Sequence, residues 1–221
     1  MKQVYGADAL QLLPCQNGFI FVTKQEEHED KAVIAYKMLD FERMTLSPVT
    51  RSVYLLAKFG SHFERFEDNP EDFLSMQTLF LPDRRLLVLR PDGNAQLLEP
   101  DGRVAWEARL TFENSLPYGL ALAETGFWVS FPNAGALVRY SLRHLRPDLR
   151  IGGDGNLPSP EGLYYENGRL LFCSPSACKL MQIDLQTFLP EDYAQLEEPV
   201  HRYLKYHANE IVLTDSGIYK L

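Results

Sequence analysis

The sequence lacks several features that would assign it to a large class of proteins. No stretch approaches the roughly 18 consecutive apolar residues of a membrane-spanning helix, and the first residues lack the apolar core of a signal peptide. Basic residues are also outnumbered, since 22 Lys and Arg stand against 30 Asp and Glu, giving a formal net charge of −8. Nucleic-acid binding needs a basic face. We therefore expect neither a membrane nor a nucleic acid as a partner.

Cysteine is scarce as well, and its three positions do not have the spacing of a metal finger. An odd number of cysteines, Cys15, Cys173 and Cys178, favours reduced and packed thiols over a disulfide framework. Reduced thiols are typical of the cytoplasm. The sequence therefore predicts a cytoplasmic protein.

The common catalytic and cofactor motifs are absent too. The sequence contains no Gly-x-Ser-x-Gly elbow, no phosphate-binding loop and no dinucleotide fingerprint. None of its five histidines belongs to a ligand-like pair within a strong motif. From these absences we predict no catalytic residue, no metal site and no cofactor, and whether the protein is an enzyme stays open, with the balance toward a protein that is not one.

What the sequence does contain is an internal repeat. Pro117-Tyr118-Gly119-Leu120 recurs about 43 positions later as Pro160-Glu161-Gly162-Leu163, and each copy is followed by a turn and an apolar run. The segments Leu137 to Leu142 and Leu180 to Leu185 match at the same offset. Further copies begin near Leu10, Thr78 and Tyr203, which makes five units. The wider spacing between the first two indicates an insertion at about 47–75.

Each unit reads as short antiparallel strands joined by tight turns, because runs of β-branched and aromatic residues alternate with Gly, Pro, Asn and Asp. Small four-stranded units of this length stack radially as propeller blades. The last unit has only about three strands, and Gln3 to Tyr5 could supply the fourth. We therefore predict an all-β, five-bladed β-propeller spanning 1–221 as a single domain, closed by N- and C-terminal strands in one blade. A two-sheet sandwich is the alternative.

The insertion is rich in apolar residues, including the segment Tyr54 to Phe59. Residues 68–75 are the one plausible helical turn, with Asn69 as N-cap and Pro70 at the first helical position. The apolar side chains must be buried against their own propeller or against a partner chain. A homodimer through the 47–75 insertion is thus one of two possibilities.

The units resemble those of NHL-repeat propellers and of the gluconolactonase (senescence marker protein) propeller family. The resemblance rests on the two Pro-x-Gly-Leu motifs and on the glycine-rich stretch Arg150 to Gly155. In the gluconolactonase family an Asn and an Asp at the second position of two such motifs hold a divalent metal. Here these positions hold Tyr118 and Glu161, and a phenol is a poor replacement for an amide carbonyl. The resemblance thus supports the fold and weakens a metal-dependent lactonase activity.

Aligned units predict which side chains meet at the channel of a propeller. One set of equivalent positions holds Gln77, Tyr118, Glu161 and Tyr203. A second set, just past each inner strand, holds Thr23, Arg90, Phe131, Cys173 and Asp215. An acid, a base and tyrosines converging on one pocket are what a small-ligand site needs. The ligand-binding candidates are Gln77, Arg90, Tyr118, Glu161, Tyr203 and Asp215. In the alternative interpretation these charges pair with each other and the tyrosines plug the channel.

Three functions remain compatible with this pattern. The first is a non-catalytic cytoplasmic propeller that serves as a binding or protein-interaction scaffold, with a protein or small-molecule ligand at its central channel. The second is a gluconolactonase-like metal-dependent hydrolase with its site at the channel. The third is a sugar-binding lectin, although lectin blades are usually near-identical and these are not.

Overall fold

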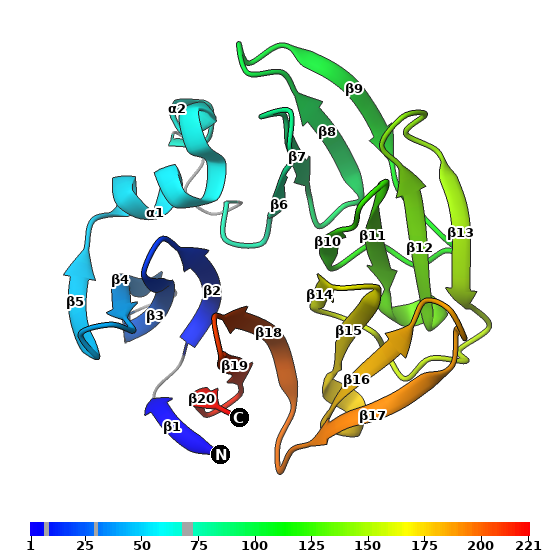
Figure 1. Ribbon diagram of the computed structural model, residues 1–221. Helices are drawn as coiled ribbons and strands as arrows, with labels where there is room; N and C mark the ends of the chain where they lie inside the picture. The colour runs from blue at the N-terminus through cyan, green and yellow to red at the C-terminus, as the bar shows by residue number, and fades with distance from the viewer. Residues whose placement is uncertain (7–8, 29–30, 68–72) are drawn as a thin grey trace. The chain divides into compact units, whose positions relative to one another are not determined.

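The computed structural model describes residues 1–6, 9–28, 31–67 and 73–221, and Figure 1 shows its strands grouped in five sheets. Each sheet has four antiparallel strands, in the orders β2-β3-β4-β5, β6-β7-β8-β9, β10-β11-β12-β13, β14-β15-β16-β17 and β1-β20-β19-β18. This is a five-bladed β-propeller, as the repeat predicts. The first strand pairs with the last, because β1 (Lys2–Tyr5) lies antiparallel to β20 (Gly217–Lys220). Closure of one blade by the two ends of the chain is therefore confirmed.

The chain forms two compact units. The terminal unit comprises Met1–Leu74 and Leu204–Leu221, and the middle unit comprises Ser75–Tyr203. Strands of the terminal unit, beside β1 and β20, are β2 (Ala9–Cys15), β3 (Gly18–His28), β4 (Lys31–Asp40), β5 (Thr45–Val49) and β19 (Asn209–Thr214). Its core joins buried side chains of β2 and β3 to those of β19 and β20. Strand β18 (Val200–Tyr206) crosses the division between the units.

The middle unit holds three complete sheets. Their strands are β6 (Gln77–Phe80), β7 (Leu86–Leu89), β8 (Asn94–Leu98), β9 (Val104–Arg109), β10 (Leu120–Leu122), β11 (Gly126–Phe131), β12 (Ala136–Ser141), β13 (Pro147–Gly152), β14 (Leu163–Glu166), β15 (Arg169–Ser174), β16 (Lys179–Asp184) and β17 (Pro190–Gln195). Two apolar clusters fill the spaces between successive sheets. The first strands β6, β10 and β14 lie next to one another on the inner side of this unit (Figure 1). We call these three, together with β18, the inner strands.

The two predicted Pro-Asp-Gly turns form, and in each the glycine has the positive φ that the turn needs. Gly93 and Gly102 close the turns after Pro91 and Pro100 with φ of 88° and 85°, a conformation that favours glycine. Asp92 accepts a hydrogen bond from the Asn94 amide at 2.9 Å, which fixes the first turn. Local turn chemistry thus sets the hairpins of the second blade.

The insertion differs from the prediction in two ways. Residues 45–49 form β5, the fourth strand of the first blade, so the insertion begins only after Val49. Its described helices are α1 (Arg51–Phe59), the 3-10 helix η1 (Gly60–His62) and α2 (Glu64–Glu67), all of which precede the predicted turn at 68–75. Residues 68–72 lie outside the described residues, and 73–75 form a non-helical turn. The helix α1, which was not predicted from the sequence, begins after Thr50, whose hydroxyl accepts a hydrogen bond from the Val53 amide.

Most of the apolar side chains of the insertion are buried within the terminal unit, including Tyr54, Leu55 and Phe59. Lys58 is buried among them and donates to the carbonyl oxygens of Phe73 and Leu74. A buried ammonium needs such acceptors. Intramolecular packing therefore accounts for this face of α1. Within the described residues no helix is both long and apolar enough to traverse a bilayer.

Candidate functional site

The glycine of each Pro-x-Gly-Leu motif lies where the backbones of neighbouring sheets approach each other very closely. A Cβ on Gly119 would lie 2.3 Å from the carbonyl oxygen of Glu161, and a Cβ on Gly162 would lie 2.4 Å from that of His201. No side chain fits at either distance, so only glycine allows the contact. The same contact in two successive sheets shows that Tyr118, Glu161 and His201 occupy equivalent positions.

A buried serine reinforces the first of these contacts. The Ser130 hydroxyl, at the end of β11, accepts a hydrogen bond from the Gly119 amide at 2.7 Å and donates to the Glu161 carbonyl oxygen at 2.7 Å. Backbone hydrogen bonds identify the equivalent residue in the next sheet. The Tyr118 amide donates to the Ser130 carbonyl oxygen, and in the next sheet the Glu161 amide donates to the Cys173 carbonyl oxygen. Cys173 is therefore the counterpart of Ser130. The repeat spacing instead predicts Phe131, one residue further along, as the counterpart of Cys173.

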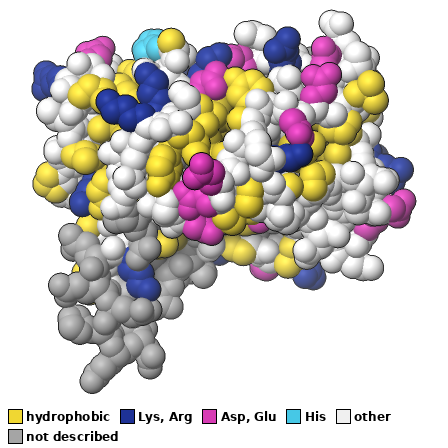
Figure 2. Space-filling model, turned by 90° about the horizontal axis from the view of Figure 1, so that it is seen from below, with side chains coloured by type: hydrophobic (Ala, Val, Ile, Leu, Met, Phe, Trp, Pro, Cys, Tyr) yellow, Lys and Arg dark blue, Asp and Glu magenta, His cyan; other side chains and the backbone are white. Residues whose placement is uncertain are grey.

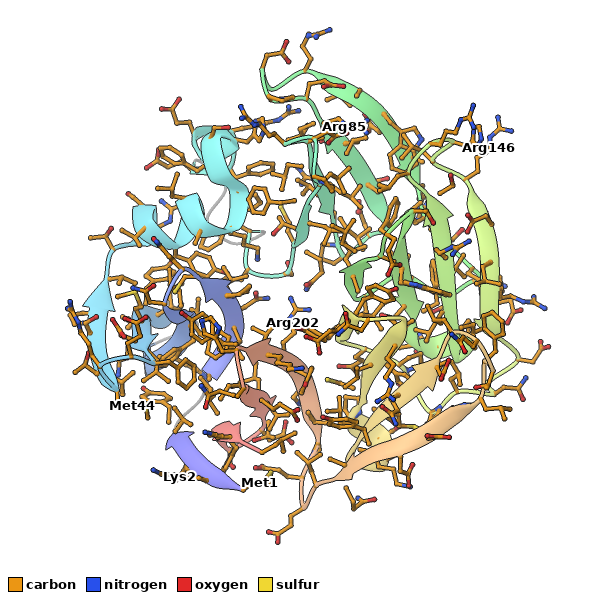
Figure 3. All side chains as sticks on the ribbon, in the orientation of Figure 1. Met1, Lys2, Met44, Arg85, Arg146 and Arg202 are labelled. Atoms are coloured by element: carbon orange, nitrogen blue, oxygen red, sulfur yellow. The ribbon has the colours of Figure 1, made fainter. Side chains whose placement is uncertain are left out.

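Five polar side chains meet beside these contacts, and we call them the inner-strand cluster: Gln77, Tyr118, Glu161, His201 and Arg202. His201 Nδ1 lies 3.4 Å from Glu161 Oε2, and the negative charge of the same carboxylate acts on the Tyr118 phenol. Arg202 donates to the amide oxygen of Gln77, 125 residues earlier in the chain. Figure 3 shows the Arg202 side chain extending from β18 toward the side on which β6 lies. All five residues belong to the middle unit.

The cluster can be reached from solvent, and its charges also act on the buried thiol of Cys173. The side chains of His201 and Glu161 are 35% and 20% exposed. Burial of the phenol raises the pKa of Tyr118, the negative charge of Glu161 raises it further, and Arg202 opposes both. Burial likewise raises the pKa of the Cys173 thiol, with smaller and opposite effects of Arg202 and Glu161. The charges of Glu161 and Arg202 therefore influence both the Tyr118 phenol and the Cys173 thiol, so the four groups are electrostatically coupled.

Chemically, the cluster combines an anion, a cation, an imidazole, a phenol and an amide. Such a set can hold a small molecule that has both donor and acceptor groups. Glu161 is the one carboxylate of the cluster, whereas hard divalent cations prefer several oxygen ligands. Among the described residues, no three His, Cys, Asp or Glu side chains are grouped so that they could hold a metal ion.

The structure brings together three of the six predicted site residues: Gln77, Tyr118 and Glu161. Tyr203 is instead 3% exposed and packs between the rings of Tyr164 and Tyr193, with centroids 5.2 Å and 6.2 Å away. Arg90 lies in the turn after β7, where its amide donates to the Asn94 carbonyl. Asp215 belongs to the terminal unit, in an exposed turn between β19 and β20. The ligand-binding role of all six stays a prediction.

Sequence reasoning missed His201 and Arg202. The alignment matched Tyr203 with Glu161, but the contact at Gly162 shows that His201 is the counterpart and that Tyr203 corresponds to Leu163. Both Leu163 and Tyr203 are buried inner-strand residues. Matching apolar positions rather than keeping a fixed offset would have found this register.

The outer surface gives less guidance than the cluster. On the face shown in Figure 2, hydrophobic side chains reach the surface among charged side chains of both signs. A mixed surface of this kind does not by itself indicate the charge of a partner.

Comparison with known proteins places the chain by fold. No family model matches the sequence, and no curated protein matches it. Several solved structures do match. One is a streptogramin B lyase, which matches with a TM-score of 0.54 and 12% sequence identity over 96% of this chain and 64% of the lyase chain. The glutaminyl cyclase of Myxococcus xanthus has a TM-score of 0.55 and 12% identity, over 98% and 92% of the two chains. Sqt1 of Saccharomyces cerevisiae has a TM-score of 0.56 and 9% identity, over 96% and 72%.

These similarities confirm the predicted resemblance to β-propellers at the level of the fold. At such identities they carry no information about activity. The chain spans 64% of the length of the streptogramin B lyase that it matches.

Proposed function

We propose that this propeller is a non-catalytic binding protein of the cytoplasm that holds a small polar ligand at the inner-strand cluster. The observation that carries the proposal is the convergence of Gln77, Tyr118, Glu161, His201 and Arg202 from four different sheets. Side chains brought together from distant parts of a chain, on or directly before packed strands and open to solvent, are typical of ligand sites. The three free cysteines support the cytoplasmic assignment.

The chemistry of the cluster narrows the ligand class. Arg202 offers guanidinium donors to a carboxylate, and Glu161 offers an acceptor to an amine or hydroxyl. Amino acids and hydroxy acids carry both kinds of group. A protein ligand would have to present the same two groups on a side chain or at a chain end, which makes it the less favoured occupant.

A ligand-observed NMR screen tests this proposal, with a mixture of free amino acids and short hydroxy acids such as lactate and gluconate as probes. We expect at least one probe to bind the wild-type protein and to lose binding in Glu161→Gln and Arg202→Gln. Arg139→Gln is the matched control, because Arg139 pairs with Asp148 on β12 and β13 of the same unit, away from the cluster. Binding that survives both cluster substitutions, or that Arg139→Gln also removes, would contradict the proposal.

A second candidate is acid–base catalysis, which the contact of 3.4 Å between His201 Nδ1 and Glu161 favours. A carboxylate beside one imidazole nitrogen fixes the tautomer of the ring, an arrangement typical of histidines that transfer protons. Hydrolysis of δ-gluconolactone, followed with and without added Ca²⁺, distinguishes the two candidates. Turnover that His201→Ala abolishes would establish an enzyme, and turnover that needs Ca²⁺ would establish the metal-dependent hydrolase instead.

A lectin is the least favoured of the three functions. Repeated sugar pockets require similar residues in each blade, whereas the equivalent positions here hold Tyr118, Glu161 and His201. These side chains differ in charge and shape, so the blades cannot present the same pocket.

A further inference from the structure

A cavity in the terminal unit has a composition that points to a ligand of its own. Its volume is about 300 Å³, and its walls come from β1, from the β4–β5 hairpin and from the ends of β19 and β20. That volume is at the lower limit of small-molecule pockets. The residues that line it belong to the terminal unit alone, so this cavity is separate from the inner-strand cluster.

The polar side of the cavity is positively charged. Lys2 and Lys220 both line it, and they are direct partners in the pairing of β1 with β20. Like charges directly opposite each other on paired strands destabilise a sheet. Within the residues that the structure describes, no carboxylate is recorded at ion-pair distance from either amine, and Lys220 donates instead to the amide oxygen of Asn209. An anion between the two lysines would relieve this repulsion.

The opposite side of the cavity is apolar and partly exposed. It consists of Leu39, Phe41, Met44 and Leu46. Met44 is 60% exposed and Leu46 46%, which is unusual for large apolar side chains that lie together beside a cavity. Figure 3 labels Met44 near the β4–β5 turn and Lys2 on β1.

The apolar wall is held in place by aromatic packing. The Phe41 ring stacks on Tyr206 at 5.7 Å and meets the edge of Phe19 at 5.2 Å. Phe19 is buried in the core of the terminal unit. The wall is therefore preformed, so that binding would not require the side chains to be ordered first.

We propose that this cavity binds a small amphipathic anion, a carboxylate on an aliphatic or aromatic body, with the carboxylate between Lys2 and Lys220 and the body against Phe41, Met44 and Leu46. None of the cavity residues is acidic, although the chain as a whole has a net charge of −8. The local charge is thus opposite to that of the molecule. A cation or a neutral polar molecule would match neither wall.

Calorimetric titration of the folded protein with octanoate and with octanamide tests the proposal. The two probes share the aliphatic chain and differ in the charge of the head group. We expect octanoate to bind at least about tenfold more tightly than octanamide, the difference expected for a charged hydrogen-bond partner. Added salt should weaken octanoate binding and leave octanamide binding unchanged.

Variants of each wall make the test specific. Lys220→Gln and the double variant Lys2→Gln/Lys220→Gln should lose the preference for octanoate, and Leu46→Asn should weaken both probes. Lys179→Gln is the matched control, because Lys179 pairs with Asp192 in the middle unit. Equal binding of the two probes to the wild-type protein, or an unchanged preference in the folded double variant, would overturn the proposal. Because no residue of the inner-strand cluster is altered, failure here is independent of the proposed function.

Discussion

Replacing Ser130 with alanine removes one oxygen atom from the contact between two neighbouring blades. That oxygen accepts from the Gly119 amide and donates to the Glu161 carbonyl, each at 2.7 Å. Ser130 is 0% exposed and Gly119 is also buried. Alanine keeps the Cβ, so the substitution changes the hydrogen bonds and little else.

The expected loss of stability can be worked out from these contacts. A buried N–H left without an acceptor costs about 1–3 kcal/mol, and the loss of a donor to the partly exposed Glu161 carbonyl costs about 0.5–1 kcal/mol more. We therefore expect the free energy of unfolding to fall by about 1.5–4 kcal/mol.

Urea denaturation followed by tryptophan fluorescence measures this loss. Both tryptophans, Trp106 and Trp128, lie in the middle unit, so the signal reports the unit that holds Ser130. Ser141→Ala is the matched control, because the Ser141 hydroxyl also takes part in two hydrogen bonds, from the amides of Arg143 and His144, but in an exposed turn. Water can replace those bonds, so the control should lose less than about 1 kcal/mol. Equal losses in the two variants would refute the reasoning.

Three further predictions concern other parts of the chain. Gly162→Ala should lower the free energy of unfolding by about 1–3 kcal/mol, since the new Cβ would lie 2.4 Å from the His201 carbonyl oxygen; an unchanged urea midpoint would contradict this. The raised pKa of Cys173 means that the unfolded chain releases the thiol proton at lower pH than the folded one, so its contribution to stability is complete below about pH 8 and declines as the pH rises above about 9. Denaturation at pH 7 and pH 10 should show a smaller decline in Cys173→Ser than in the wild type, and equal declines would contradict the assignment. The homodimer through the insertion, the alternative to packing within one chain, would give twice the chain mass in light scattering for the wild type and the single mass for Leu56→Glu, because Leu56 is 53% exposed on α1; a monomeric wild type would exclude this interface.

Local chemistry explains why so much of the fold could be predicted from the sequence. Strands and turns depend on residues close together in the chain, as Pro91 and Gly93 illustrate, and the repeat of these signals at a regular spacing predicts five similar sheets. The glycine of each Pro-x-Gly-Leu motif is likewise a local signal for a close approach of backbones. The helix α1 escaped prediction because Lys58, a charged residue on its buried side, interrupts the apolar pattern.

The composition of the site depended on contacts that spacing along the chain does not determine. In the last blade the offset changes, so that His201 rather than Tyr203 lies beside Glu161, and a shift of two residues keeps the same face of the strand while changing which side chain reaches the site. The pairing of Gln77 with Arg202 joins residues 125 positions apart. Sequence alone determined that blades form and where their inner strands begin. Only the tertiary structure decided which side chains meet there, because the packing of one sheet on the next fixes the register.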